Sequence, residues 1–193
     1  MASLVLTGDT SGSLTVSAPA IAGSNTQTLV ATTGTLAPIV SGTAVASTSG
    51  TSIDFTGIPS WVKRITVMFN GVSLSGTSGI IIQIGASSFT TSGYISSGSR
   101  QINNTSLDVG SYTTGFGIDS SSAANLIFGS FVLTNMGSNI WTCAGLFNST
   151  TGQVAIYTTS GSVALAGTLD RVRNTTFNGT DTFDAGSINI LYE

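Results

Sequence analysis

The chain has 193 residues, among them 30 serines, 30 threonines and 24 glycines, but no histidine and only 13 charged side chains, five basic and eight acidic, for a net charge of −3. General acid–base chemistry near neutral pH depends on histidine, or on carboxylates and lysines with shifted pKa values, so we expect neither an enzyme nor a cofactor. Phosphate binding needs clustered lysine and arginine, so nucleic acid is not an expected partner.

Residues 1–50 differ from the rest of the chain because they contain no aromatic residue and a single charge, at Asp9. Short alternating apolar pieces, Leu4–Leu6, Leu14–Val16 and Thr28–Val30, predict strands that cannot close a core of their own. We therefore expect an extended N-terminal arm or stalk, whose candidate contacts with other subunits or proteins are Leu4, Leu6, Leu14, Val16 and Leu29. A flexible linker would have the same composition, and this alternative stays open.

Residues 51–193 have the pattern of one compact β-domain, in which apolar residues alternate between clusters of Gly, Asn and Ser. The pairs Asn70-Gly71 and Asn178-Gly179 tolerate positive φ at a hairpin or a bulge. Helical periodicity is missing over any useful length, and Asp119–Asn125 is predicted to be a loop. About eight regularly spaced strands predict an all-β fold, an antiparallel β-sandwich or jelly-roll-like domain. The predicted strands are Arg64–Val72, Gly79–Ile84, Leu126–Met136, Ile140–Phe147, Gln153–Thr159, Ser162–Ala166, Leu169–Phe177 and Phe183–Tyr192.

The segment Ser60-Trp-Val-Lys63 has the S-x-x-K spacing of acyltransferases that use lysine as the base. That chemistry places both residues on one face of a helix, whereas here the segment follows Pro59 and leads directly into the alternating Ile65 and Val67. We therefore assign no catalytic residue and expect the start of a strand, with Trp61 packed over a turn.

Cys143 is the single cysteine and lies in the apolar run Ile140–Phe147. Nothing basic nearby would favour a thiolate, so we predict a small buried side chain. The basic groups Lys63-Arg64 and Arg171-Val-Arg173 are predicted to be strand residues paired with nearby aspartates.

Asp170, Asp181 and Asp184 are the carboxylates whose spacing suggests chemistry. Two acids about 5 to 9 Å apart can cleave a glycosidic bond, and Asn178–Asp184 brings three oxygen donors into one turn, as a hard cation prefers. Aspartate is also a common turn residue, and the arginines of the preceding strand can neutralise it. We favour turn and ion-pair roles and assign no metal ligand, while a cation at Asp181 and Asp184 stays open.

Tyr94 and Tyr112 are the aromatic residues that we expect to be exposed. They lie in the weakly periodic, Ser- and Gly-rich region from Ser87 to Gly117, where the loops of a sandwich would project. They are therefore the candidate aromatic contacts for a receptor.

The surface is expected to be covered by hydroxyl and amide groups, because charged residues make up only 7% of the chain. Burying such a surface desolvates few charges, so we expect a homo-oligomer. No run approaches the roughly 18 apolar residues of a membrane helix. Met1–Asp9 lacks the basic and apolar regions of a secretory signal, so we expect assembly in the cytoplasm and no membrane insertion.

Three segments resemble tail-associated structural proteins of bacteriophages and prophages. Two of them are Arg171–Glu193, RVRNTTFNGTDTFDAGSINILYE, and Gly50–Gly71, GTSIDFTGIPSWVKRITVMFNG. The third, Ala18–Leu29, APAIAGSNTQTL, is similar to the low-charge N-terminal segments of phage fibre proteins. No functional residue is carried over, since this group is defined by where its members occur.

The resemblance implies a virion component, a short tail fibre or similar appendage that forms a trimer. The arm would attach to a tail, portal, adaptor or capsid protein, and the β-domain would face outward, for adhesion to a host-surface glycan or protein. An extended arm of 50 residues reaches less than roughly 170 Å, which is short for a receptor-binding fibre. A decoration or cement protein of the capsid or tail, with no receptor, is the alternative.

Overall fold

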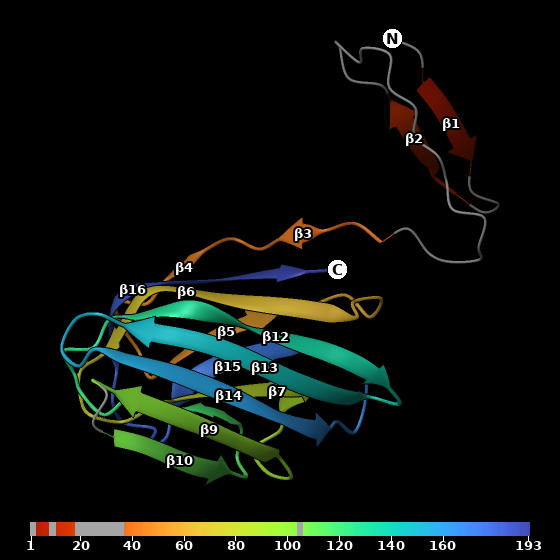
Figure 1. The fold of residues 1–193 in the computed structure, drawn as a ribbon. Helices are drawn as coiled ribbons and strands as arrows, with labels where there is room; N and C mark the ends of the chain where they lie inside the picture. The colour runs from red at the N-terminus through yellow and green to blue at the C-terminus, as the bar shows by residue number, and fades with distance from the viewer. Residues whose placement is uncertain (1–2, 8–10, 18–36, 104–105) are drawn as a thin grey trace. The chain divides into compact units, whose positions relative to one another are not determined.

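The computed structural model describes residues 3–7, 11–17, 37–103 and 106–193 (Figure 1). The chain divides into two compact units, Met1–Leu36 and Ala37–Glu193. Strands and turns make up the described parts of both units, and within these ranges no helix is long and apolar enough to cross a bilayer.

The first unit contains an antiparallel pair of strands, β1 (Ser3–Thr7) and β2 (Ser13–Ser17). These strands confirm two of the three short strands predicted for the arm, while the third, Thr28–Val30, lies outside the described residues. Val5, Leu6 and Val16 are each more than half exposed. The hairpin thus presents apolar side chains to its surroundings.

The division between the units lies earlier than the predicted boundary at residue 50, because residues 37–50 pair with the second unit. Two short strands, β3 (Val40–Ser41) and β4 (Val45–Ala46), pair with the last strand of the chain, β16 (Phe183–Tyr192). Ser47 is fully buried, and its hydroxyl donates to the carbonyl of Ala185 at 2.6 Å. Backbone pairing decides this boundary, and the apolar pattern of so short a segment does not reveal it.

The second unit is an antiparallel β-sandwich of a nine-stranded and a five-stranded sheet, which confirms the predicted all-β fold (Figure 1). The large sheet has the order β10-β9-β14-β13-β12-β6-β16-β3, with β4 also on β16, and the small sheet has the order β11-β7-β15-β5, with β8 on β7. The remaining bounds are β5 (Ser52–Thr56), β6 (Arg64–Leu74), β7 (Ile80–Ala86), β8 (Ser88–Phe89), β9 (Ile95–Ile102), β10 (Ser106–Tyr112), β11 (Phe116–Ile118), β12 (Ile127–Gly137), β13 (Ile140–Ser149), β14 (Ala155–Ala164) and β15 (Arg171–Thr176).

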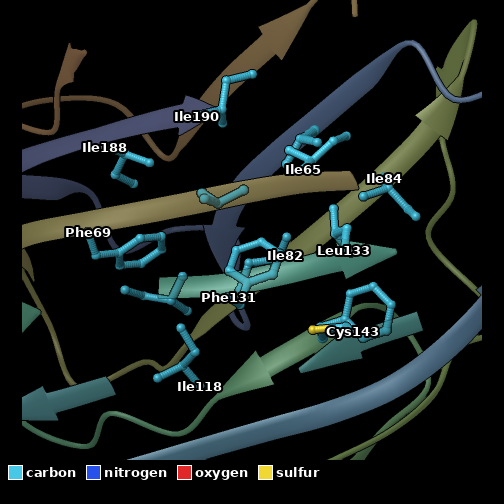
Figure 2. Close-up of a cluster of buried hydrophobic side chains, with 14 of the residues drawn as sticks. Ile65, Phe69, Ile82, Ile84, Ile118, Phe131, Leu133, Cys143, Ile188 and Ile190 are labelled. Atoms are coloured by element: carbon cyan, nitrogen blue, oxygen red, sulfur yellow. The ribbon is translucent and has the colours of Figure 1, made fainter. Parts of the chain in front are cut away.

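The core lies between the two sheets and follows the alternation of the strands (Figure 2). Phe131 and Leu133 of β12 and Ile188 and Ile190 of β16 project into it from the large sheet, and Ile82 projects into it from the small sheet. Each large aliphatic or aromatic side chain buried in this way contributes roughly 1.5 to 3 kcal/mol relative to exposure. The core therefore supplies the main stabilisation of the sandwich.

Strand β7 is buried on both faces, which explains its unbroken apolar run Ile80–Ile82 followed by Gln83 and Ile84. Gln83 is 8% exposed and its Nε2 donates to the carbonyl of Thr114 at 3.0 Å, so the amide is satisfied on the outer side of the small sheet. An isoleucine run of this kind is typical of a strand covered on both sides.

The Asn-Gly pairs lie where they were predicted. Gly71 has φ +65° inside β6, where the register of the neighbouring strands shifts, so this pair forms a bulge. Gly179 has φ +68° in the turn before β16, and the Asn178 side-chain oxygen accepts hydrogen bonds from the backbone of Thr180 and Asp181. Positive φ is the reason glycine is favoured at both the bulge and the turn.

The region from Ser87 to Gly117, predicted to be loops, instead contains β8, β9, β10 and β11. Serines and glycines lie on both faces of β9, including the buried Ser96 and Gly98, so the apolar alternation is absent although the strand pairs with β14 along its length. The two strands predicted over Gln153–Ala166 form the single strand β14. Sheet pairing organises these segments, since their side chains provide little periodic signal.

Candidate interaction surface

The outer face of the large sheet, the face turned away from the small sheet, carries no charged side chain across its three central rows. One row contains apolar and hydroxyl side chains in register across six strands: Met68, Ser130, Leu146, Thr158, Ser99 and Val109. The adjacent row contains Phe128, Asn148, Ile156, Gln101 and Leu107, and a third contains Thr66, Val132, Ala144, Ser160, Ser97 and Ser111. A partner could cover these rows without desolvating a charge.

Apolar side chains gather at the β10 end of this face, and we call them the outer-face patch. They are Leu107 at 69% exposure, Val109 at 72%, Leu146 at 62%, Val154 at 54% and Ile156 at 52%. Shallow, open hollows lie among them, lined by Gln101, Asn148, Leu146, Val154 and Ile156 together with Phe128. Contiguous exposed apolar side chains of this kind mark interaction sites.

Hydroxyl groups between the apolar residues are partly satisfied within the sheet. Ser99 Oγ and Thr158 Oγ1 lie 2.7 Å apart across β9 and β14, so each has a partner that does not depend on water. A hydroxyl that already has a hydrogen bond costs less to bury than one that loses its water. These two hydroxyls can therefore be buried in a contact without losing their hydrogen bond.

The predicted receptor contact at Tyr94 is wrong. Tyr94 is 2% exposed, and its ring packs edge-on against Phe116 with the centroids 5.0 Å apart. Its hydroxyl accepts from the backbone N–H of Ile84 at 2.9 Å and donates to the carbonyl of Thr90 at 3.0 Å. Because β11 pairs with β7 only as far as Ile82, this hydroxyl takes over hydrogen bonding at the β7 edge beyond the end of β11.

Tyr112 is half-buried instead of projecting from a loop. It belongs to β10 and stacks on Phe177 with a centroid separation of 5.0 Å and an interplanar angle of 21°. The phenolic oxygen is enclosed and has no hydrogen-bond partner within the described ranges, and burial raises the pKa of this side chain. A hydroxyl enclosed in this way cannot contact a receptor.

Of the predicted arm contacts, Leu6 and Val16 are exposed. Leu4 lies opposite Val16 and Leu6 opposite Leu14 in the register of the hairpin. Leu29 lies outside the described residues.

The C-terminal carboxylates have the turn and ion-pair contacts that were favoured for them. Asp170 pairs with Arg171 at 2.7 Å, which lowers the pKa of Asp170. Asp181 accepts from the backbone of Ser78 at 2.9 Å, and its pKa is lowered chiefly by the Asn178 side chain. Asp184 accepts from the hydroxyl of Ser73. In the part of the chain that the structure describes, no group of three His, Cys, Asp or Glu residues could hold a metal.

The two arginines of β15 are paired with aspartates, as predicted, whereas Arg64 pairs with a glutamate and Lys63 lies just before β6. Arg173 forms two hydrogen bonds with Asp54, at 2.8 and 2.7 Å, and Arg64 pairs with Glu193 at 2.5 Å. Arg173 also lies over the ring of Phe89, 4.0 Å from the centroid. These pairs hold β5 to β15 and the chain end to β6, so they are structural.

The remaining motifs have the structural roles predicted for them. The backbone N–H of Val62 donates to the carbonyl of Pro59, so a turn precedes β6. The ring of Trp61 in this turn packs against the ring of Tyr192, with the centroids 5.9 Å apart. Cys143 is 5% exposed, and burial raises the pKa of its thiol to about 12. A thiol with such a pKa is neutral and unreactive near pH 7.

A polar cluster that the sequence did not reveal underlies the loop before β12. Asn125 donates to Tyr157 and to Ser120, and accepts from the backbone of Gln153. Nearby, the Arg100 side chain is 13% exposed, pairs with Asp108 at 2.7 Å and donates to the backbone carbonyl of Asp119 at 3.3 Å. These contacts hold the predicted Asp119–Asn125 loop against β9 and β14.

The outer-face patch was also missed, although the sequence contains a signal for it. Adjacent apolar residues such as Leu146-Phe147 and Ile156-Tyr157 cannot both face the core, because neighbours in a strand point to opposite faces. Phe147 and Tyr157 are buried, so Leu146 and Ile156 face outward.

No family model, no curated protein and no solved structure matches this chain.

Proposed function

We propose that this protein is a non-catalytic structural component of a bacteriophage particle, similar to a short tail fibre, that assembles with other copies of itself. The resemblance of Gly50–Gly71 and Arg171–Glu193 to tail-associated proteins supports the location. The uncharged central rows on the outer face of the large sheet support self-assembly and are the observation that carries the proposal. The first unit, with its exposed Val5, Leu6 and Val16, is the proposed attachment to the particle.

Assembly is tested by native mass measurement of the full chain. We expect a homo-oligomer, which the resemblance implies to be a trimer. The variant Leu146→Asp places a charge in the outer-face patch and should weaken association, because that charge must be desolvated in the contact. Met136→Asp is the matched control. Met136 is 70% exposed and lies near the end of β12, away from Ser130, the residue of β12 that pairs with Leu146. A wild-type chain that stays monomeric throughout a concentration series would contradict self-assembly.

Location is tested with antibodies against residues 37–193 on particles released by cells that express the chain. Label at the tail is expected for a fibre. Particles without label would refute the virion proposal. Deleting residues 1–36 should abolish incorporation while the sandwich keeps its thermal unfolding, because residues 37–193 form a compact unit of their own.

A decoration protein of the capsid or tail is the second candidate, and one observation favours it. The region from Ser87 to Gly117, expected to supply receptor-binding loops, is folded into strands, and Tyr94 is buried within it. Label spread over the head would support decoration, and host adhesion would then have no part in the function. Binding of the purified chain to host cells would support adhesion instead.

A further inference from the structure

The four sheet edges of the sandwich differ in how they are protected against pairing with another strand. The outer edge of the large sheet near the chain start is made by β3 and β4, which have two residues each and follow Pro38. In the small sheet, β11 has three residues, and β5 carries Asp54 in an ion pair with Arg173. Short length, proline and charge are the usual devices that prevent edge-to-edge association.

Strand β10 has none of these protections on its outer side. It runs for seven residues, Ser106–Tyr112, and contains no proline, lysine or arginine. It pairs with β9 on one side, and among the described residues no strand pairs with its other side. Its single charge, Asp108, lies opposite Arg100, which it contacts at 2.7 Å, so this charge is neutralised within the fold. An edge of this length leaves backbone donors and acceptors that another strand can satisfy.

The side chains of β10 also favour a partner whose outer face is apolar next to the shared edge. Leu107 and Val109 are the most exposed members of the outer-face patch and lie on the row ends next to this edge. A strand that pairs antiparallel with β10 across a two-fold axis perpendicular to the sheet keeps both outer faces on the same side. The two patches then become one continuous apolar strip, and no charge of either central face is buried.

We propose that two copies of the chain join along β10, antiparallel and edge to edge, so that their large sheets form one continuous sheet. The occupant is a second copy because its β10 has the complementary backbone groups, and the central rows of its outer face are uncharged and end in the same apolar residues, Leu107 and Val109. The contact is isologous, so by itself it produces a dimer, in contrast to the trimer that the resemblance implies. The proposal goes beyond the proposed function, because it specifies a contact and a symmetry that apply wherever the protein is located.

The first experiment measures the mass of the full chain and of an edge variant, Leu107→Lys with Val109→Lys. Lysine on an edge strand opposes pairing, so the wild-type mass should fall two-fold in the variant. Met136→Lys is the control and should keep the wild-type mass. Circular dichroism and thermal unfolding verify that each variant is folded. A wild-type monomer, or an assembly whose mass the edge variant leaves unchanged, would overturn the proposal.

The second experiment does not depend on the lysine variant and also determines the register. Cysteine is introduced singly at Leu107, Val109 or Ser111 in a Cys143→Ala background, and the chain is oxidised. A residue close to the two-fold axis lies opposite the same residue of the second copy. A disulfide forms only where the Cα atoms of these two residues are about 4.4 to 6.8 Å apart. We expect a covalent dimer at one of these positions and none for Met136→Cys. Assembly as a trimer without any β10 cross-link would refute edge pairing while leaving the virion proposal intact.

Discussion

Tyr94→Phe removes one oxygen atom from the interior of the sandwich and leaves the ring in place. In the native protein the Tyr94 hydroxyl accepts from Ile84 N–H and donates to the Thr90 carbonyl. The side chain is 2% exposed, so water cannot replace the lost hydroxyl easily. The ring contact with Phe116, at 5.0 Å between the centroids, should persist. The variant therefore isolates the hydrogen bonds at the edge of β7.

The expected cost is about 1 to 3 kcal/mol in the free energy of unfolding, because a buried N–H that loses its acceptor bears its full desolvation penalty. For a domain of this size, that cost lowers Tm by roughly 2 to 12 °C. Urea unfolding at equilibrium measures the free energy, and an unchanged m-value shows that the folded and unfolded states are otherwise comparable.

Tyr112→Phe is the matched control because it makes the same chemical change in the same sandwich with the opposite expectation. The Tyr112 oxygen is enclosed without a hydrogen-bond partner among the described residues, so its removal should be neutral or slightly stabilising. Equal destabilisation by both substitutions, or a Tyr94→Phe effect within about 0.5 kcal/mol of zero, the usual range of surface substitutions, would refute the reasoning.

Three further predictions concern a bulge, the buried thiol and the carboxylate of Asp181. Gly186→Ala should lower the free energy of unfolding by about 2 kcal/mol or more, because Gly186 has φ +87° and a Cβ there would collide with the backbone of Gly71. Gly179→Ala, with φ +68° and open space around the Cβ, should cost about 1 kcal/mol, and similar losses in urea unfolding for the two variants would contradict the clash. Cys143 should react with a thiol reagent only on unfolding. Its pKa is raised from 9.0 to about 12, so the neutral thiol stabilises the fold below pH 9 and this contribution is lost as the pH rises toward 12. Cys143→Ala should therefore show a smaller alkaline loss of Tm than the wild type, and rapid labelling of the folded protein would disprove the burial argument. The pKa of Asp181 is lowered from 3.8, so its ionised form stabilises the fold above that pH, and this contribution is lost as the pH falls further. Asp181→Asn should lower Tm at pH 7 and have a smaller effect near the acid end of a pH series, whereas a pH-independent difference would exclude a role for the charge.

Several parts of the fold follow from the sequence alone because their causes are local. Alternation of Ile65, Val67 and Phe69 predicts a half-buried strand, and these three residues are in the core. The apolar setting of Cys143 predicts its burial. The Asn70-Gly71 pair predicts positive φ, since glycine adopts it without steric cost. The sequence also argues against a catalytic role for the S-x-x-K segment, because Pro59 and the alternation that follows Lys63 are not typical of a helix.

Other parts depend on residues far apart in the chain. Tyr94 lies in a Ser- and Gly-rich segment that suggests an exposed loop, but its hydroxyl is needed where β11 ends and the β7 edge at Ile84 lacks a strand partner. Strand β9 exists because β14 pairs with it, and its own side chains give no apolar alternation. The end of the first unit at Leu36 likewise depends on the pairing of β3 and β4 with β16.

The outer-face patch falls between these two cases. The adjacent pairs Leu146-Phe147 and Ile156-Tyr157 establish that one member of each must face outward. Only the register of β12, β13, β14, β9 and β10 brings Leu146 and Ile156 together with Val109 in uncharged rows beside an unprotected edge. The sequence by itself determined an all-β chain with a conventional core, because alternation and turn residues act over a few positions. The tertiary structure decided which surface is available to a partner, because a sheet face is assembled from strands that are distant in sequence.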